Sequence, residues 1–249
     1  MSKNTIKIAN CSGFYGDRLS AAKEMVDGGP IDVLTGDYLA ELTMAILYGQ
    51  KIQRGEKAGY VGTFLKQLKQ IASSCSEKNI KVVSNAGGLN PKSMAEEVKN
   101  ILDSEGLNLK VAYIDGDDFM DKFDELKKNG EELKNLDTGV SLFKQSLPAV
   151  SANYYLGCWG IKQALDEGAD IVICPRVTDA ALVMGPAAWK FNWSRDDYDK
   201  LAGSLAAGHI IECGAQATGG NYSFFKEVPS FQNVGFPIAE IEESGNFKI

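Results

Sequence analysis

The sequence has one histidine, few basic residues relative to acidic ones and no long apolar run, and each shortage excludes a class of function. The lone His209 rules out metal sites and catalytic centres that need two imidazoles. A formal net charge of -7 and the lack of a basic run argue against a nucleic-acid partner. No apolar stretch approaches the roughly 18 residues that span a bilayer, so we expect no membrane partner.

Paired cysteines and nucleotide-binding loops are also missing. The five cysteines show no C-x-x-C spacing, which argues against a zinc site or a redox pair and fits a reducing cytosol, so we expect a cytoplasmic protein. There is no G-x-G-x-x-G and no G-x-x-x-x-G-K-[ST] motif, so the sequence lacks the fingerprint of a nicotinamide or P-loop nucleotide cofactor. The cofactor is therefore unknown.

Short β-type runs alternate with helical stretches, which predicts an α/β fold: a mainly parallel sheet with helices on both faces and a ligand cleft at the carboxyl ends of the strands. The 249 residues suffice for a single large α/β domain, residues 1–249. We expect strands at residues 6–9, 31–35, 80–84, 110–114 and 170–173, and helices at residues 18–26, 38–47, 60–75, 91–103 and 180–188.

Two segments depart from this alternation. Residues 119–150 are rich in lysine and glutamate at their start, which predicts a solvated helical insertion. Near the other end, residues 237–241 resemble a strand, and the residues that follow resemble a turn entering a second strand. From this ending we expect the chain to be the N-terminal part of a longer architecture.

The most informative stretch follows the apolar run that ends at Ile173. It places Arg176, Thr178 and Asp179 directly before a helix, at the end of a predicted buried strand. A buried guanidinium needs a carboxylate or phosphate partner. That partner is either internal, Asp179 or Asp37, or it is an anionic ligand, and the sequence leaves both open.

Other predicted strand exits carry glycine or polar residues. Glycine allows close approach of a backbone, and helix N-termini favour anions. We therefore expect these loops to bind substrate, although tight turns and structural helix caps explain the same residues. The candidates for substrate binding are Gly13, Asp37, Asn85, Gly87 and Gly88, together with Arg176 and Thr178.

The run Asp115-Gly116-Asp117-Asp118 raises the question of a metal. Its carboxylates suit magnesium or calcium, but the rest of an EF-hand loop is missing. We therefore expect no metal site.

A second dense cluster begins at the only histidine. His209 and Glu212 offer an acid or base near neutral pH, and Gln216 and Asn221 offer amides for substrate binding. Together with Asp179, His209 and Glu212 are the catalytic candidates. Cys213 could instead act as a nucleophile if its thiolate is stabilised. For His209, a structural role at a helix end is the alternative to catalysis.

Six motifs follow one another along almost the whole chain: residues 12–17, 37–44, 85–91, 151–157, 176–182 and 208–221. In these motifs the chain resembles the acyclic terpene utilisation proteins of the AtuA type, specifically their N-terminal domain. The resemblance implies a part in the breakdown of citronellol- and geraniol-type acids as coenzyme A esters, without carrying over any catalytic residues. The family usually continues beyond this length.

Two functions follow as hypotheses. The first is a lyase- or hydratase-like enzyme of terpene or related acyl-CoA and carboxylate catabolism, in which Arg176 binds the small anionic substrate, His209 moves a proton and Asp179 orients Arg176 or acts as the base. The second is a non-catalytic subunit that binds an anionic ligand or serves as a scaffold in a catabolic complex. The sequence also leaves open whether the chain forms a homo-oligomer and whether a C-terminal domain is a further partner.

Overall fold

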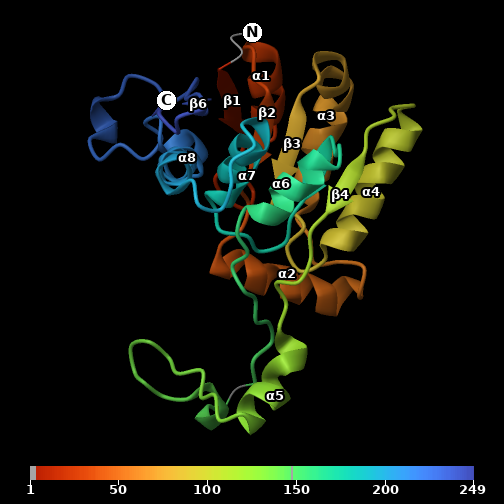
Figure 1. Ribbon diagram of the computed structural model, residues 1–249, viewed down its shortest axis with the longest axis vertical. Helices are drawn as coiled ribbons and strands as arrows, with labels where there is room; N and C mark the ends of the chain where they lie inside the picture. Colours follow the sequence, from red (N-terminus) through yellow and green to blue (C-terminus); the bar gives the residue numbers. More distant parts are fainter. Residues whose placement is uncertain (1–3, 147) are drawn as a thin grey trace.

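The computed structural model describes residues 4–146 and 148–249, in which seven strands form one sheet of order β4-β5-β3-β2-β1-β6-β7 (Figure 1). Strands β1 to β5 pair in parallel, whereas β6 pairs antiparallel with β1 and with β7. The predicted mainly parallel sheet is thus confirmed, and so is the closing hairpin. The strands are β1 (Thr5–Asn10), β2 (Val33–Gly36), β3 (Lys81–Ser84), β4 (Val111–Tyr113), β5 (Ile171–Ile173), β6 (Ile238–Glu242) and β7 (Phe247–Lys248).

Helices cover both faces of the sheet because the central strands are apolar on both sides. Along β2, Leu34 packs into the core on one face and Val33 into the core on the other, as the alternation of strand side chains requires. The first core lies under α1 (Ala21–Gly28), α3 (Gly62–Lys78) and α4 (Pro91–Ser104), and the second under α6 (Trp159–Asp166), α7 (Ala181–Lys190) and α8 (Tyr198–Ile211).

The start of α4 agrees with its sequence signals. The Asn90 side chain accepts a hydrogen bond from the Ser93 amide at 3.1 Å, and Pro91 occupies the first helical position. The start of this helix, predicted from Asn90 and Pro91, is thus confirmed.

Helix α8 was not predicted, because glycines weaken the helical signal of its sequence. In the fold these glycines allow close packing. A Cβ at Gly208 would lie 2.9 Å from the Cα of Ala180, and a Cβ at Gly203 would lie 2.1 Å from the backbone oxygen of Gly245. Helix α6 was also missed, and both helices belong to the second core.

The segment between β4 and α6 extends away from the sheet (Figure 1). It contains α5 (Phe123–Lys128) and the short 3-10 turns Met120–Lys122 and Leu142–Lys144, so it holds less helix than its composition predicted. Phe119 stacks on Tyr154 with ring centroids 4.3 Å apart. This contact joins the two ends of the segment where it leaves the sheet and where it returns.

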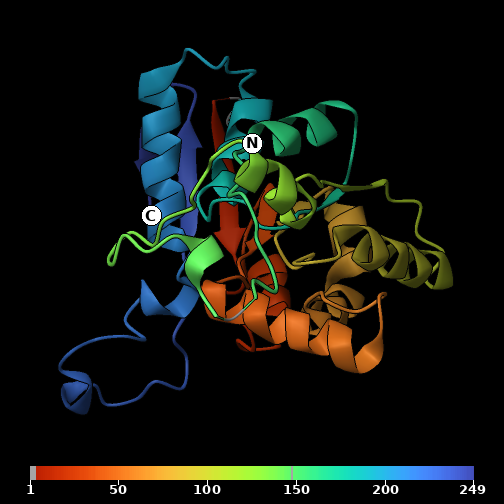
Figure 2. The same ribbon diagram turned by 90° about the horizontal axis from the view of Figure 1, so that it is seen from below.

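The sheet changes its winding between β3 and β5. These neighbouring strands are followed by α4 on one face and α7 on the other, which makes a topological switch point, the usual ligand site of an open α/β sheet. Helix α2 (Glu41–Arg54) runs across the same edge (Figures 1 and 2). None of the described helices is both long and apolar enough for a membrane span.

Candidate active site

Arg176 lies at this switch point, just after β5, with only 4% of its surface exposed. Its Nη1 donates to Asp179 Oδ1 at 2.6 Å and to the Val177 carbonyl at 3.1 Å. The guanidinium carbon lies 4.1 Å from the centre of the Tyr155 ring. Of the alternatives that the sequence left open, the structure shows the internal partner Asp179, while the buried Nε of Arg176 has no acceptor among the described residues.

The backbone of Arg176 is held by the base of the projecting segment. Asp117 is buried, and its Oδ2 accepts hydrogen bonds from the Arg176 amide at 3.1 Å and from Asn153 Nδ2 at 2.8 Å. The Leu156 amide donates to the Arg176 carbonyl at 3.1 Å. The loop after β4 and the return of the segment therefore fix the arginine loop.

Asp37 reaches the same edge from the end of β2. Its Oδ1 accepts hydrogen bonds from Asn85 Nδ2 at 2.6 Å and from the Leu39 amide at 3.3 Å. Asn85 Oδ1 in turn accepts from the Tyr38 amide at 2.8 Å. Asn85, predicted as a substrate ligand, thus orients Asp37 in the structure.

Glu212 comes from the other face of the sheet, at the C-terminal end of α8. The last carbonyls of a helix have no intrahelical partner, and here Asn10 supplies donors for two of them. Its Nδ2 donates to the carbonyls of Ile211 at 2.7 Å and of Glu212 at 2.9 Å. The exit of β1 therefore holds the end of α8, and with it Glu212, at the carboxyl edge.

Three carboxylates converge here, and we call Asp37, Asp179 and Glu212 the edge cluster. One oxygen from each lies within 4.8 Å of the others. Burial, and next the charge of Asp179, raise the pKa of Asp37 to about 7, and the same two causes raise the pKa of Glu212. The cluster therefore holds more negative charge than its surroundings stabilise.

His209 stands at the rim of this cluster, in the last turn of α8. Its Nδ1 lies 3.4 Å from Glu212 Oε1, and its side chain is 76% exposed. The ring is thus not buried against helix carbonyls. Through Glu212 the ring links solvent to the edge cluster. The structure therefore brings together five predicted site residues: Arg176, Asp179, Asp37, Glu212 and His209.

Cys213 is the next residue along the chain and is exposed, whereas the other four cysteines are buried as small hydrophobes. Partial burial, and next the charge of Glu212, raise the pKa of the Cys213 thiol. A thiol held in its neutral form is a poor nucleophile. This environment does not favour the alternative of cysteine catalysis.

The glycine-rich loops lie at the edge, but their amides are used within the fold. The amides of Gly13, Gly87 and Gly88 donate to Asp17 Oδ2 at 2.9 Å, the Cys174 carbonyl at 3.1 Å and the Asn85 carbonyl at 3.2 Å, respectively. A Cβ at Gly13 would lie 2.4 Å from the Cys213 carbonyl carbon. Glycine at this position therefore serves the close packing of the β1 exit on the end of α8.

Other predicted binding residues stand apart from the buried groups. Thr178, Gln216 and Asn221 are exposed, and the last two lie in the loop after α8. Within the described parts of the chain, no side-chain hydrogen bond links them to the edge cluster. Their role in substrate binding stays a prediction.

The acidic run after β4, which we call the loop cluster (Asp115, Asp117 and Asp118), does not converge. Asp115 and Asp118 are exposed, and Asp118 Oδ1 accepts a hydrogen bond from the Met120 amide at 2.9 Å. Asp117 turns inward to the arginine loop. Among the described residues, these three carboxylates therefore do not form a group that could hold one cation.

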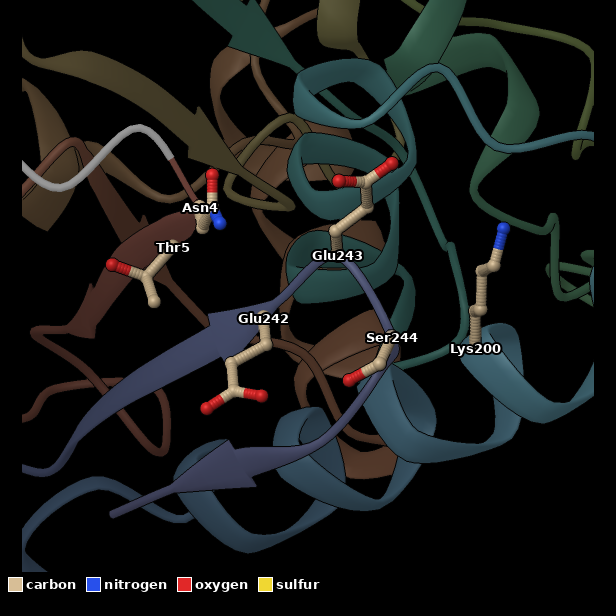
Figure 3. Close-up of a pocket in the computed structure, with 6 residues that line it drawn as sticks. All are labelled: Asn4, Thr5, Lys200, Glu242, Glu243 and Ser244. Carbon is tan, nitrogen blue, oxygen red and sulfur yellow. The ribbon is translucent and has the colours of Figure 1, made fainter.

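A cavity of about 630 Å³ lies at the opposite edge of the sheet, by the start of β1 and the turn between β6 and β7 (Figure 3). Figure 3 shows that Glu242 points away from Glu243 and Lys200 and that the last two stand apart, so these three charged groups do not converge. Size alone does not make this cavity a site, and the predicted site residues that converge lie at the carboxyl edge.

Three supporting residues were not predicted: Asn10, Asp117 and Tyr155. Asn10 carried a signal, because it is an amide directly after a strand, but its partners lie about 200 positions later. Tyr155 shields Arg176, and its hydroxyl donates to Glu41. Only the folded arrangement of distant segments shows these roles.

The family model described as acyclic terpene utilisation family protein AtuA matches residues 6–249. No curated protein and no solved structure matches the chain. The match therefore establishes the family of the chain, whereas its reaction has to be inferred from the candidate site.

Proposed function

Because the chain belongs to the acyclic terpene utilisation family AtuA, we propose that it is an enzyme of terpene catabolism that acts on a carboxylate or acyl-CoA substrate in a lyase- or hydratase-type step. The observation that carries this proposal is the orphaned Nε of Arg176, a buried cationic donor beside carboxylates and the only histidine. Buried polar groups are normally hydrogen-bonded. A substrate carboxylate or thioester oxygen would supply the acceptor.

The contacts of Asp179 and His209 suggest a different role for each. Asp179 holds the guanidinium of Arg176, so it orients the anion site rather than acting as the base. His209 touches Glu212 and is open to solvent, which suits it to carry a proton between substrate and water. A lyase or hydratase step needs such a transfer, since a proton is removed beside a carbonyl or delivered to a leaving group.

Non-catalytic anion binding is the second candidate. One observation favours it: the amides of Gly13, Gly87 and Gly88 are already used, so these loops do not offer free donors for an oxyanion. Binding would then involve Arg176 without chemistry at His209.

A binding and exchange experiment separates the two candidates. Thermal unfolding is followed with acyl-CoAs and with dicarboxylates, and a ligand at 100 times its Kd stabilises the fold by about 2.7 kcal/mol. The stabilising ligand is then incubated in deuterated water, and exchange of its α protons is followed by NMR. We expect binding that Arg176→Lys weakens and exchange that His209→Gln abolishes.

The outcomes have distinct meanings. Binding without exchange in the wild-type protein would replace the enzyme proposal with the binding proposal. Absence of stabilisation by every anion tested would overturn both. Arg195→Lys is the matched control, because Arg195 is exposed and stacks on Trp159 away from the edge cluster.

A further inference from the structure

The geometry points to a divalent-cation site formed by the edge cluster, Asp37, Asp179 and Glu212, for a hard, Mg²⁺-like ion. This inference extends the proposed function by naming a cofactor class for the same site, and it departs from the expectation of no metal. Among the described residues, these three acidic side chains have oxygens close enough together to bind one metal ion, all within 4.8 Å of one another. Oxygens bound to one Mg²⁺ at about 2.1 Å lie about 3–4.2 Å apart, so only small side-chain shifts are needed.

One buried oxygen of the cluster lacks a partner. Glu212 Oε2 has no hydrogen-bond donor among the described residues and is shielded from solvent. A buried carboxylate oxygen is costly without a partner, and a cation between the three carboxylates would satisfy it. Asp37 is only 6% exposed and accepts its two hydrogen bonds at Oδ1, so its Oδ2 would serve as a ligand.

The charges of the site also fit a divalent ion. Three ionised carboxylates carry three negative charges, and Arg176 offsets one of them through its contact with Asp179. Two negative charges remain in a partly buried setting, and one divalent cation would neutralise them. Arg176 engages Asp179 Oδ1, so the second oxygen of this carboxylate remains for a metal.

The donor set selects the kind of ion. All three ligands are carboxylate oxygens from the exits of β2 and β5 and the end of α8, and His209 contacts Glu212 at the rim. Zinc prefers sulfur and nitrogen donors, whereas Mg²⁺ binds through a few carboxylates and keeps several waters. Calcium takes six to eight oxygens, more than these residues provide without many waters.

Mn²⁺ alone is the probe for the test, because its free form is counted by electron paramagnetic resonance. The full chain is treated with a chelator, dialysed and titrated with Mn²⁺ in the absence of substrate. We expect one Mn²⁺ per chain, displaced by Mg²⁺, and at least tenfold weaker binding in Asp37→Asn and in Glu212→Gln. Asp115→Asn and Asp118→Asn in the loop cluster are the matched controls and should bind like the wild type.

Wild-type protein provides a second readout that does not depend on the folding of a variant. Paramagnetic broadening by substoichiometric Mn²⁺ should remove the amide NMR signals of Asp37, Asp179 and Glu212 before others. Absence of saturable binding, unchanged affinity in Asp37→Asn and Glu212→Gln, or broadening first at residues 115–118 would each overturn the inference. The anion-binding experiment, repeated in chelator, tests the proposed function separately.

Discussion

The edge cluster and the loop cluster each contain three acidic residues, yet the first converges and the second does not. Asp115, Asp117 and Asp118 are near neighbours in sequence, but one is buried and two are exposed. Asp37, Asp179 and Glu212 are far apart in sequence, and their oxygens meet within 4.8 Å. The acidic residues of one loop diverge here, whereas the edge cluster is gathered by the sheet, through the exits of β2 and β5, and by the packing of the end of α8 on the exit of β1.

The two clusters also differ in how well their surroundings stabilise the carboxylate charges. The edge cluster surrounds one buried arginine, and burial with mutual repulsion raises the pKa of Asp37 and of Glu212. In the loop cluster, two carboxylates are solvated and the third, Asp117, accepts two hydrogen bonds. Substitutions in the two clusters should therefore differ strongly in their effects.

The largest effect is expected from Arg176→Met, which retains a side chain of similar length but removes the charge. Asp179 loses its partner, and removal of one member of a buried ion pair costs about 3–5 kcal/mol. We expect the lower end, about 3 kcal/mol, because Asp179 is partly exposed. Urea unfolding at neutral pH measures the loss, with the exposed Arg54→Met as control. Equal stability of the two variants would show that Asp179 does not depend on Arg176.

Asn85→Ala should follow, with a loss of about 2 kcal/mol in the free energy of unfolding. It removes the donor to Asp37 and the acceptor of the Tyr38 amide, and both groups are left buried without these partners. Asn90→Ala is a matched control in the same loop, where loss of the helix cap costs about 1 kcal/mol. A smaller loss in Asn85→Ala than in Asn90→Ala would contradict the role of Asn85 at the edge cluster.

Asp117→Asn tests the buried member of the loop cluster through its pH dependence. Burial raises the pKa of Asp117 above its ordinary value of 3.8, so the folded state binds the proton more tightly than the unfolded state. This carboxyl group therefore favours folding at low pH and loses that contribution as the pH rises through its raised pKa. The asparagine oxygen can accept the same two hydrogen bonds without titrating.

The measurement is the free energy of unfolding of the wild type and of Asp117→Asn from pH 4 to pH 8. Relative to the wild type, the variant should gain stability as the pH rises. A constant difference across this range would mean that Asp117 does not titrate differently in the folded protein.

The smallest effects are expected from Asp115→Asn and Asp118→Asn, which should each change the free energy of unfolding by less than about 0.5 kcal/mol. Both side chains are exposed, and only Asp118 makes a hydrogen bond, to the Met120 amide. Urea unfolding of these variants sets the baseline for the edge cluster. A loss as large as that of Asn85→Ala would erase the distinction between the two clusters.

Much of the fold followed from local patterns, and the errors have a common cause. The five parallel strands and the cap at Asn90 were predicted, because apolar runs and capping residues act over a few positions. Helix α8 was missed because Gly203 and Gly208 weaken the helical pattern, and close packing against Gly245 and Ala180 explains them. The segment after β4 has less helix than its charged composition indicated.

For the candidate site, the sequence singled out Arg176, Asp179, Asp37, Glu212 and His209 one by one, but it did not pair them. It left the partner of Arg176 open, and it gave no sign that Asn85, predicted to bind substrate, hydrogen-bonds Asp37. Pairing depends on strand order and on the position of α8, which Asn10 fixes from the other end of the chain. These contacts join residues too distant for any local pattern to reveal.

The sequence by itself determined that polar residues end the strands of a parallel sheet and share its carboxyl edge, because parallel strands that alternate with helices all end on the same side. The tertiary structure alone decided which of them meet. Asp117 was directed away from its acidic neighbours and into the arginine loop, and Glu212 was brought to Asp37 and Asp179. The physical reason is that side-chain convergence depends on strand order and helix packing, which act across the whole chain.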